Sequence, residues 1–260
     1  HTRLIGRLGW LEHVIVTPSH HRVHHAINPE YMDKNYGQIF IFWDKWFGTF
    51  QPELPEVPAV YGVKRPVHTW NPFRINFQHF WLLLTDAWRT GNWRDKLRIW
   101  FMPTGWRPED VKARYPVAAI SDVYHFDKYD TKASRGLVAW SWTQMFFNYF
   151  LLIYFFAFLG RIGSPGIFLY GAFVFCSIYA YTELMDRNRH AHLFEILKSA
   201  FGLYLIWQAG GDWFGARANV GAWYVYIVAA YCIVSALVAT AFVEREIKKE
   251  ERGDLVVVGN

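Results

Sequence analysis

The sequence predicts an all-α, polytopic membrane protein in which a helical, histidine-rich region precedes about four transmembrane helices. Two observations carry this prediction. Hydrophobic residues make up 53% and aromatic residues 20% of the chain. The apolar residues concentrate in 137–243, whereas residues 1–135 hold most of the histidines and prolines. Long apolar runs of this kind are typical of helices that cross a bilayer.

The net charge of +5 at pH 7 is compatible with nucleic acid binding, but the pattern of charge argues against it. Lys and Arg do not cluster beside exposed aromatic residues, as a nucleic-acid face requires. They flank the apolar runs, as the basic cytoplasmic loops of membrane proteins do. We therefore expect a membrane and no nucleic acid partner. Cys176 and Cys232 lie inside apolar runs and are predicted to be small hydrophobic residues, not a disulfide or a metal pair.

The first 16 residues show helical spacing of apolar side chains and predict a helix. A second helix is predicted to follow, with Thr17 as its N-cap and Pro18 as its first residue. Asn28 precedes Pro29, and a residue in that position is pushed out of the helical region, so the helix should end there.

This second helix carries four histidines within six residues. His21, His24 and His25 stand at i, i+3 and i+4, which places their Cβ atoms about 5–6 Å apart on one face. Neutral imidazole is a common ligand of zinc, iron and copper, so the three predict half of a metal site. His20 points about 100° away, which favours a second-shell or surface position over ligation.

The loop after this helix could supply partners for the imidazoles. A metal-bound histidine usually donates its other N–H to a carboxylate or carbonyl, which fixes its tautomer. Capping of the loop itself is the alternative for each residue. The candidates for the second shell, together with His20, are Asn28, Asp33, Asn35, Tyr36 and Asp44. The aromatic segment 38–50 is expected to line the floor of the site or to lie in the membrane interface.

Residues 51–60 are a proline-spaced connector, and 74–101 show helical periodicity with an aromatic and a basic side. This favours an amphipathic helix on an anionic membrane surface, with an ordinary packed helix as the alternative. The predicted division of the chain places a catalytic region at 1–60, an interfacial connecting region at 61–135, transmembrane helices at 136–243 and a charged tail at 244–260.

Four apolar runs are candidates for crossing about 30 Å of hydrocarbon. The third is short and contains Glu195 and Lys198. Four crossings would place every basic cluster on one side, as the positive-inside rule expects, and would put the histidines on the cytoplasmic side. The runs are 137–159, 165–184, 193–209 and 220–243.

Several motifs together resemble one family. HRVHH at 21–25 resembles the last histidine box of the fatty acid hydroxylase / sterol desaturase superfamily. The upstream pairs His1-Thr2, Leu8-Gly9 and Leu11-Glu12 resemble its alkylglycerol monooxygenase-like branch, including bacterial relatives. The downstream residues match the superfamily's tail in order and spacing: Asn28, Asp33-Lys34-Asn35-Tyr36-Gly37, Trp43-Asp44-Lys45 and Phe47-Gly48-Thr49-Phe50.

The resemblance implies a helical histidine-box catalytic region with a di-iron centre bound almost wholly by histidine. His21, His24 and His25 would bind iron, with His1 as a further ligand. The superfamily uses three histidine boxes, and only the last is present here. The chain opens at His1 without an initiator Met, so we expect it to be the C-terminal part of a longer protein.

The implied activity is that of an integral-membrane non-haem di-iron oxygenase that uses O₂ on a lipid C–H bond. In the branch with the strongest resemblance, this would cleave an O-alkylglycerol ether, with tetrahydropterin as reductant. The alternative within the superfamily is a sterol or fatty-acyl desaturase or hydroxylase, supplied with electrons by cytochrome b5 or by ferredoxin and a reductase. The expected location is a bacterial inner membrane or the endoplasmic reticulum.

Two alternatives come from other classes of protein. A non-catalytic membrane scaffold would not need three imidazoles in register. A zinc-dependent membrane hydrolase is the other alternative, and the identity of the bound metal separates it from the oxygenase. A metalloprotease of the HExxH type would carry a Glu inside the box, and there is none. Structural zinc usually recruits Cys, and no Cys lies near the histidines.

Overall fold

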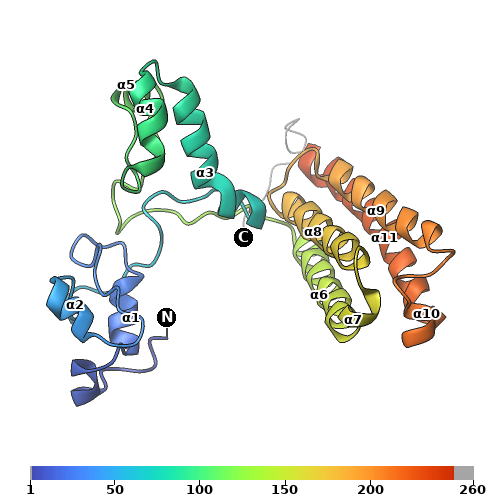
Figure 1. Ribbon diagram of the computed structural model, residues 1–260, viewed down its shortest axis with the longest axis horizontal. Helices are drawn as coiled ribbons and strands as arrows, with labels where there is room; N and C mark the ends of the chain where they lie inside the picture. The colour runs from blue at the N-terminus through green and yellow to red at the C-terminus, as the bar shows by residue number, and fades with distance from the viewer. Residues whose placement is uncertain (1, 249–260) are drawn as a thin grey trace. The chain divides into compact units, whose positions relative to one another are not determined.

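The computed structural model describes residues 2–248, and it divides into two compact units (Figure 1). Unit 1 comprises His1–His68 with Leu82–Tyr129, and unit 2 comprises Thr69–Trp81 with Asp130–Asn260. Within the described residues the regular elements are helical, and the only β interactions are two isolated bridges. The all-α expectation is therefore confirmed for this part of the chain.

Unit 1 is built from short helices. Among residues 2–16, which the structure describes, a 3₁₀ turn, Gly9–His13, is the only regular element, so the predicted helix over 1–16 is wrong. Gly9 has φ 61°, a left-handed conformation that interrupts a right-handed helix. The remaining elements are α1 (Pro18–His24), α2 (Phe42–Phe47), residues 82–89 of α3 (Pro72–Arg89), α4 (Trp93–Arg98), η2 (Ile99–Phe101) and α5 (Glu109–Arg114).

The helix predicted over 74–101 is interrupted. It divides into α3 and α4 because Gly91 follows α3 and Asn92 starts a new helix, its side chain accepting a hydrogen bond from the Arg94 N–H at 3.0 Å. In α3, Asp86 is buried and both of its carboxylate oxygens accept hydrogen bonds from the guanidinium of Arg107, which is also buried, at 2.5 and 2.9 Å. This pair joins α3 to the loop before α5.

Unit 2 is a bundle of four long helices joined by short turns. Helix α6 (Arg135–Ala157) packs on α8 (Gly166–Met185), α8 packs on α9 (Ala191–Gln208), and α9 packs on α11 (Ala222–Phe242) (Figure 1). The short helices α7 (Leu159–Ile162) and α10 (Ala216–Asn219) lie in the turns, and a π-helical turn, Val243–Ile247, extends α11. The four long helices correspond to the four predicted apolar runs.

Only two described helical segments are long and apolar enough to cross a membrane, namely Gly166–Met185 and Ala222–Ile247. Helix α6 carries buried Gln144 and Asn148, and α9 carries buried Glu195 and Lys198. These polar residues lower the apolar character of both helices. Two helices of this length and composition are compatible with a membrane protein. Most of the predicted tail, 249–260, lies outside the described residues.

Close packing in unit 2 depends on one small residue. A Cβ at Gly202 of α9 would come within 2.5 Å of Phe173 Cε2 on α8 and 2.8 Å of Cys232 Sγ on α11. Glycine at this position lets three helices approach one another closely. Cys232 is buried and free, and Cys176 is half-buried and free.

Candidate metal centre

Helix α1 begins where the sequence predicts. Thr17 is its N-cap in an extended conformation and Pro18 is its first residue. The Thr17 N–H donates to His20 Nδ1 at 3.3 Å, so His20 acts as the N3 residue of a capping box. His20 is only 2% exposed and packs edge-on against Phe50, with ring centroids 5.7 Å apart. A surface position for His20 is therefore wrong, because its ring closes the start of the helix.

The other three histidines of this stretch lie on an exposed side of α1. His21, His24 and the C-cap residue His25 are exposed, whereas Arg22 and Val23 between them are buried. The ring centroids of His21 and His25 are 4.5 Å apart, those of His24 and His25 are 4.9 Å apart, and those of His21 and His24 are 6.2 Å apart. The helix thus gathers three imidazoles on one face, as the i, i+3, i+4 spacing predicts.

The environment favours the neutral form of two of these imidazoles. Partial burial, with the neighbouring histidines, lowers the pKa of His25 below its usual value, and burial is also the leading cause of the lowered pKa of His21. A metal ligand must be deprotonated on the coordinating nitrogen, so this shift prepares both residues for ligation. His24 Nδ1 lies 3.4 Å from the Lys34 carbonyl oxygen. Donation to that oxygen would leave Nε2 as the coordinating atom.

As a donor set, three imidazoles fit iron, zinc or copper. Among the residues that the structure describes, however, no group of three or more His, Cys, Asp or Glu side chains is arranged to hold a metal ion. The three rings are neighbours, but they do not converge on one point. The predicted ligand His1 lies outside the described residues.

The loop residues predicted as second-shell partners mostly fix the loop itself. Asn28 is fully buried: its amide donates to the Pro58 carbonyl at 3.2 Å, and its oxygen accepts from the Val60 N–H at 2.8 Å. Asn35, at φ 55°, pairs with both backbone groups of Gln51, donating at 2.8 Å and accepting at 2.9 Å. These are the contacts of loop capping, the alternative left open above.

Asp44 has the same kind of role. Its carboxylate accepts from the Tyr36 N–H at 2.7 Å, the Gly37 N–H at 2.8 Å and the Thr49 hydroxyl at 2.7 Å. Gly37 is needed for this approach, since a Cβ there would lie 2.8 Å from Asp44 Oδ2. The Tyr36 hydroxyl donates to Asp33, and the Tyr36 ring meets the His24 ring edge-on at 6.0 Å. Tyr36 therefore contacts the histidine face through its ring.

Sequence reasoning missed one ion pair that anchors α1. Arg22 donates through Nε and Nη2 to both carboxylate oxygens of Glu53, with a shortest distance of 2.6 Å. The Arg22 Nη1 group donates to the carbonyls of Thr2 and Ile5, each at 2.9 Å. The pair joins residues 31 positions apart, and an arginine between two histidines gives no local signal of such a partner.

Helical composition, membrane-compatible helices and a face of three imidazoles define a histidine-rich helical membrane protein. Comparison with known proteins makes this specific. Residues 1–49 match the family described as fatty acid hydroxylase. The chain is 33% identical over 207 residues to an alkylglycerol monooxygenase from Xenopus tropicalis, covering 79% of this chain and 46% of the relative. It is 44% identical over 108 residues to the Homo sapiens alkylglycerol monooxygenase, covering 42% of this chain and 24% of the relative.

A more distant match, 36% identical over 56 residues, is to a Delta(7)-sterol 5(6)-desaturase from Gibberella zeae, covering 22% of this chain and 16% of the relative. These findings confirm the fatty acid hydroxylase superfamily, and within it the chain is alkylglycerol monooxygenase-like. The chain spans less than half the length of these relatives. No solved structure matches it.

Proposed function

We propose that this chain is part of an integral-membrane non-haem di-iron oxygenase that hydroxylates a lipid C–H bond. The observation that carries the proposal is the row of three imidazoles on the exposed face of α1, inside the segment that matches the fatty acid hydroxylase family. His21, His24 and His25 would hold iron, with His1 as a further ligand. Bound iron would supply the activation of O₂ that an unreactive C–H bond requires.

The residues of this chain prepare the site. Burial of His20 and the ion pair between Arg22 and Glu53 fix the rotation of α1, so that the three ligands face outward together. The Lys34 carbonyl orients His24 through Nδ1. The hydrogen bond from the Tyr36 N–H to the Asp44 carboxylate fixes the loop, which holds the Tyr36 ring against the same face.

For the substrate, we propose an O-alkylglycerol. The match to alkylglycerol monooxygenases covers most of this chain, which favours them over other relatives. Hydroxylation of the carbon beside the ether oxygen gives a hemiacetal, which collapses and breaks the ether bond. Tetrahydropterin would be the reductant. The alternative is a sterol or fatty-acyl desaturase or hydroxylase supplied by cytochrome b5 or ferredoxin and a reductase, and the sterol desaturase match supports keeping it.

We further propose that all four long helices of unit 2 cross the membrane. Basic residues that precede α6, that lie between α8 and α9, and that follow α11 would then share the cytoplasmic side, and the histidine site with them. This topology suits a bacterial inner membrane or the endoplasmic reticulum.

Metal analysis of the full-length protein tests the proposal. We expect about two irons per chain after expression with iron supplied, and ether cleavage when alkylglycerol, tetrahydropterin and O₂ are added. Iron with turnover only of sterols or fatty acids would support the desaturase or hydroxylase alternative. Zinc alone would indicate a hydrolase, and absence of bound metal would indicate a scaffold; either result contradicts the proposal.

A further inference from the structure

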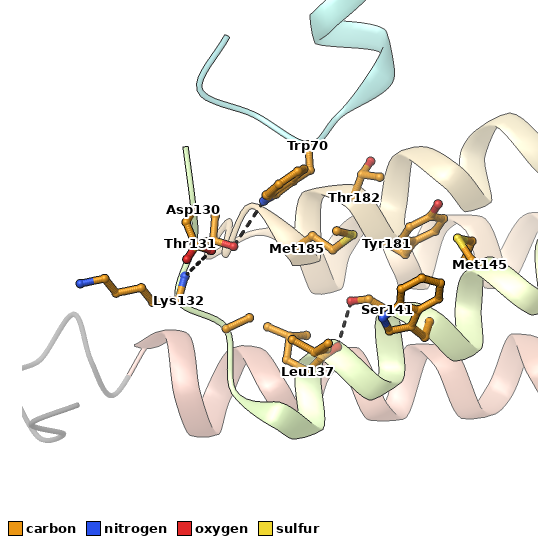
Figure 2. A pocket seen from close by; sticks show the side chains of 13 residues that line it. Trp70, Asp130, Thr131, Lys132, Leu137, Ser141, Met145, Tyr181, Thr182 and Met185 are labelled. Carbon is orange, nitrogen blue, oxygen red and sulfur yellow. Dashed lines mark hydrogen bonds between the residues drawn. The ribbon is translucent and has the colours of Figure 1, made fainter. Parts of the chain in front are cut away.

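Unit 2 contains a cavity that the proposed chemistry does not use. It has a volume of about 570 Å³ and lies between α6 and α8 (Figure 2). This volume is within the roughly 300–1,000 Å³ of ordinary ligand pockets. The side chains that line its length are mainly apolar or aromatic: Leu137, Val138, Trp142, Met145, Tyr181 and Met185.

Two of the hydroxyl groups that line this cavity, those of Ser141 and Thr182, are bonded to the backbone. Ser141 Oγ donates to the Leu137 carbonyl of its own helix at 2.9 Å, and Thr182 Oγ1 donates to the Ile178 carbonyl at 2.7 Å. With both donors bonded to the backbone, neither needs a ligand atom. The interior therefore fits a hydrocarbon chain better than a polar molecule.

One end of the cavity is polar and rigidly built. The Trp70 N–H donates to Asp186 at 2.6 Å, and the Trp70 indole N–H lies 3.4 Å from the Thr131 hydroxyl (Figure 2). Beside them, Lys132 is held at φ 44°, with its carbonyl accepting from Arg187 at 3.1 Å. A non-glycine residue in this conformation is strained, and such strain persists only where the surroundings enforce it.

Charge at this end favours an anion. Lys132 and Arg135 precede or begin α6, and Arg189 follows α8; all three are exposed. Of the two nearby carboxylates, Asp186 already accepts the Trp70 N–H, and Asp130, which lines the same end, accepts the Lys132 N–H at 3.3 Å. Figure 2 shows the Lys132 side chain directed away from the apolar interior, so its ammonium would meet a headgroup outside the cavity while only the hydrocarbon enters.

The dimensions match a lipid within one leaflet. The α6 lining from Leu137 to Met145 extends about 12 Å along the helix axis at 1.5 Å per residue, which approaches half of the roughly 30 Å hydrocarbon core. We propose that this cavity binds one chain of a lipid with an anionic phosphate headgroup, the headgroup lying against Lys132 and Arg135. The site belongs to unit 2 and does not require the iron centre, but it does require unit 2 to lie in a membrane.

Photo-crosslinking tests the site in the full-length protein. The protein is placed in phosphatidylcholine nanodiscs with a lysophosphatidic acid that carries a diazirine at the end of its chain, and labelled peptides are mapped by mass spectrometry. We expect labelling of the peptides that contain Met145 and Tyr181. A monoacylglycerol with the same chain and no phosphate should label them several-fold less.

Two matched variants locate the binding. Val138→Trp would fill the cavity from an exposed lining position, and Ile153→Trp would place the same side chain on an exposed part of α6 outside the cavity. Val138→Trp should reduce the labelling several-fold, and Ile153→Trp should leave it unchanged.

Labelling that is spread over the outer faces of the bundle and unaffected by Val138→Trp would overturn the site. Equal labelling by both probes would overturn the anionic headgroup. The readout is a crosslink map, so its result does not depend on whether the protein oxidises lipids.

Discussion

Lys198 Nζ lies 2.5 Å from Glu195 Oε2, and both side chains are fully buried among the helices of unit 2. Three other helices complete the network. Gln144 of α6 donates to Glu195 at 2.7 Å, and Lys198 donates to Ser235 of α11 at 2.7 Å. The hydroxyl of Tyr231, also on α11, donates to Gln144 at 2.7 Å and lies 2.9 Å from the Ser177 hydroxyl of α8. A charged pair in this position persists only because each partner is hydrogen-bonded.

Breaking this pair should be more damaging than removing it. Lys198→Met leaves the Glu195 carboxylate buried without its cation, and we expect a loss of about 3–5 kcal/mol in the free energy of unfolding. The double variant Glu195→Leu with Lys198→Met should recover part of that loss. Equilibrium unfolding in detergent measures both. Single variants that each cost less than about 1 kcal/mol would show that the pair does not hold the bundle together.

Gly202→Ala should destabilise unit 2 although alanine favours helices more than glycine by about 1 kcal/mol. Its Cβ would overlap Phe173 and Cys232, and overpacking of this kind costs about 1–3 kcal/mol. Gly171→Ala on α8 is the control, because a Cβ there meets nothing within 4 Å. Thermal unfolding should show a lower midpoint for the first variant and an equal or higher midpoint for the second. The reverse order would contradict the close packing of α9.

His24→Ala should abolish iron retention and turnover in the full-length protein, because it removes one of the three imidazoles on the exposed face of α1. His13→Ala is the matched control, since His13 is exposed and lies outside α1. Iron per chain after gel filtration is the measurement. A His24→Ala protein that still holds two irons would disprove the ligand assignment.

The Glu12 carboxyl makes the stability of unit 1 depend on pH in the acidic range. Burial raises the pKa of this carboxyl, but hydrogen bonds from Ser19, the Leu8 N–H and Thr17 outweigh burial and bring the pKa below its usual 4.5. The pKa of Glu12 is lower in the folded state than in the unfolded state. The ionised carboxylate therefore stabilises the fold at pH values above the unfolded-state pKa, and this stabilisation is lost as the pH falls through the folded-state pKa.

We therefore expect unfolding of unit 1 to become easier below about pH 4.5, by less than about 1 kcal/mol for this group because solvent screens it. Glu12→Gln should remove that part of the acid dependence while leaving the remaining pH profile in place. Urea midpoints between pH 3 and 6 measure the difference. Parallel profiles for the two proteins would show that Glu12 contributes nothing.

Arg107→Lys should loosen the junction between α3 and the loop before α5. Lysine cannot reproduce the two parallel hydrogen bonds to Asp86 or the 2.9 Å bond from Nη1 to the Tyr115 carbonyl. We expect a loss of about 2–4 kcal/mol and faster proteolysis between residues 90 and 115. Arg94→Lys, at an exposed position on α4, should leave the cleavage rate unchanged.

Local sequence signals predicted several features well. Thr17-Pro18 predicted the start of α1 because the cap and the fixed φ of proline act within one turn. The i, i+3, i+4 spacing predicted the shared face of His21, His24 and His25. The four apolar runs predicted the four long helices, although only two of them have the composition expected of a membrane span.

Other features required contacts between distant residues. Burial of His20 with exposure of its neighbours depends on how α1 is held, and Arg22 finds Glu53 31 residues away. The partners of Glu195 and Lys198 come from two other helices, α6 and α11, and periodicity within α9 contains no information about them. By itself, the sequence determined the start of α1, the positions of the four long helices of unit 2 and which histidines share a face, because these follow from local geometry. The tertiary structure decided which faces are buried and which charges are paired, because these depend on packing between segments far apart in the chain.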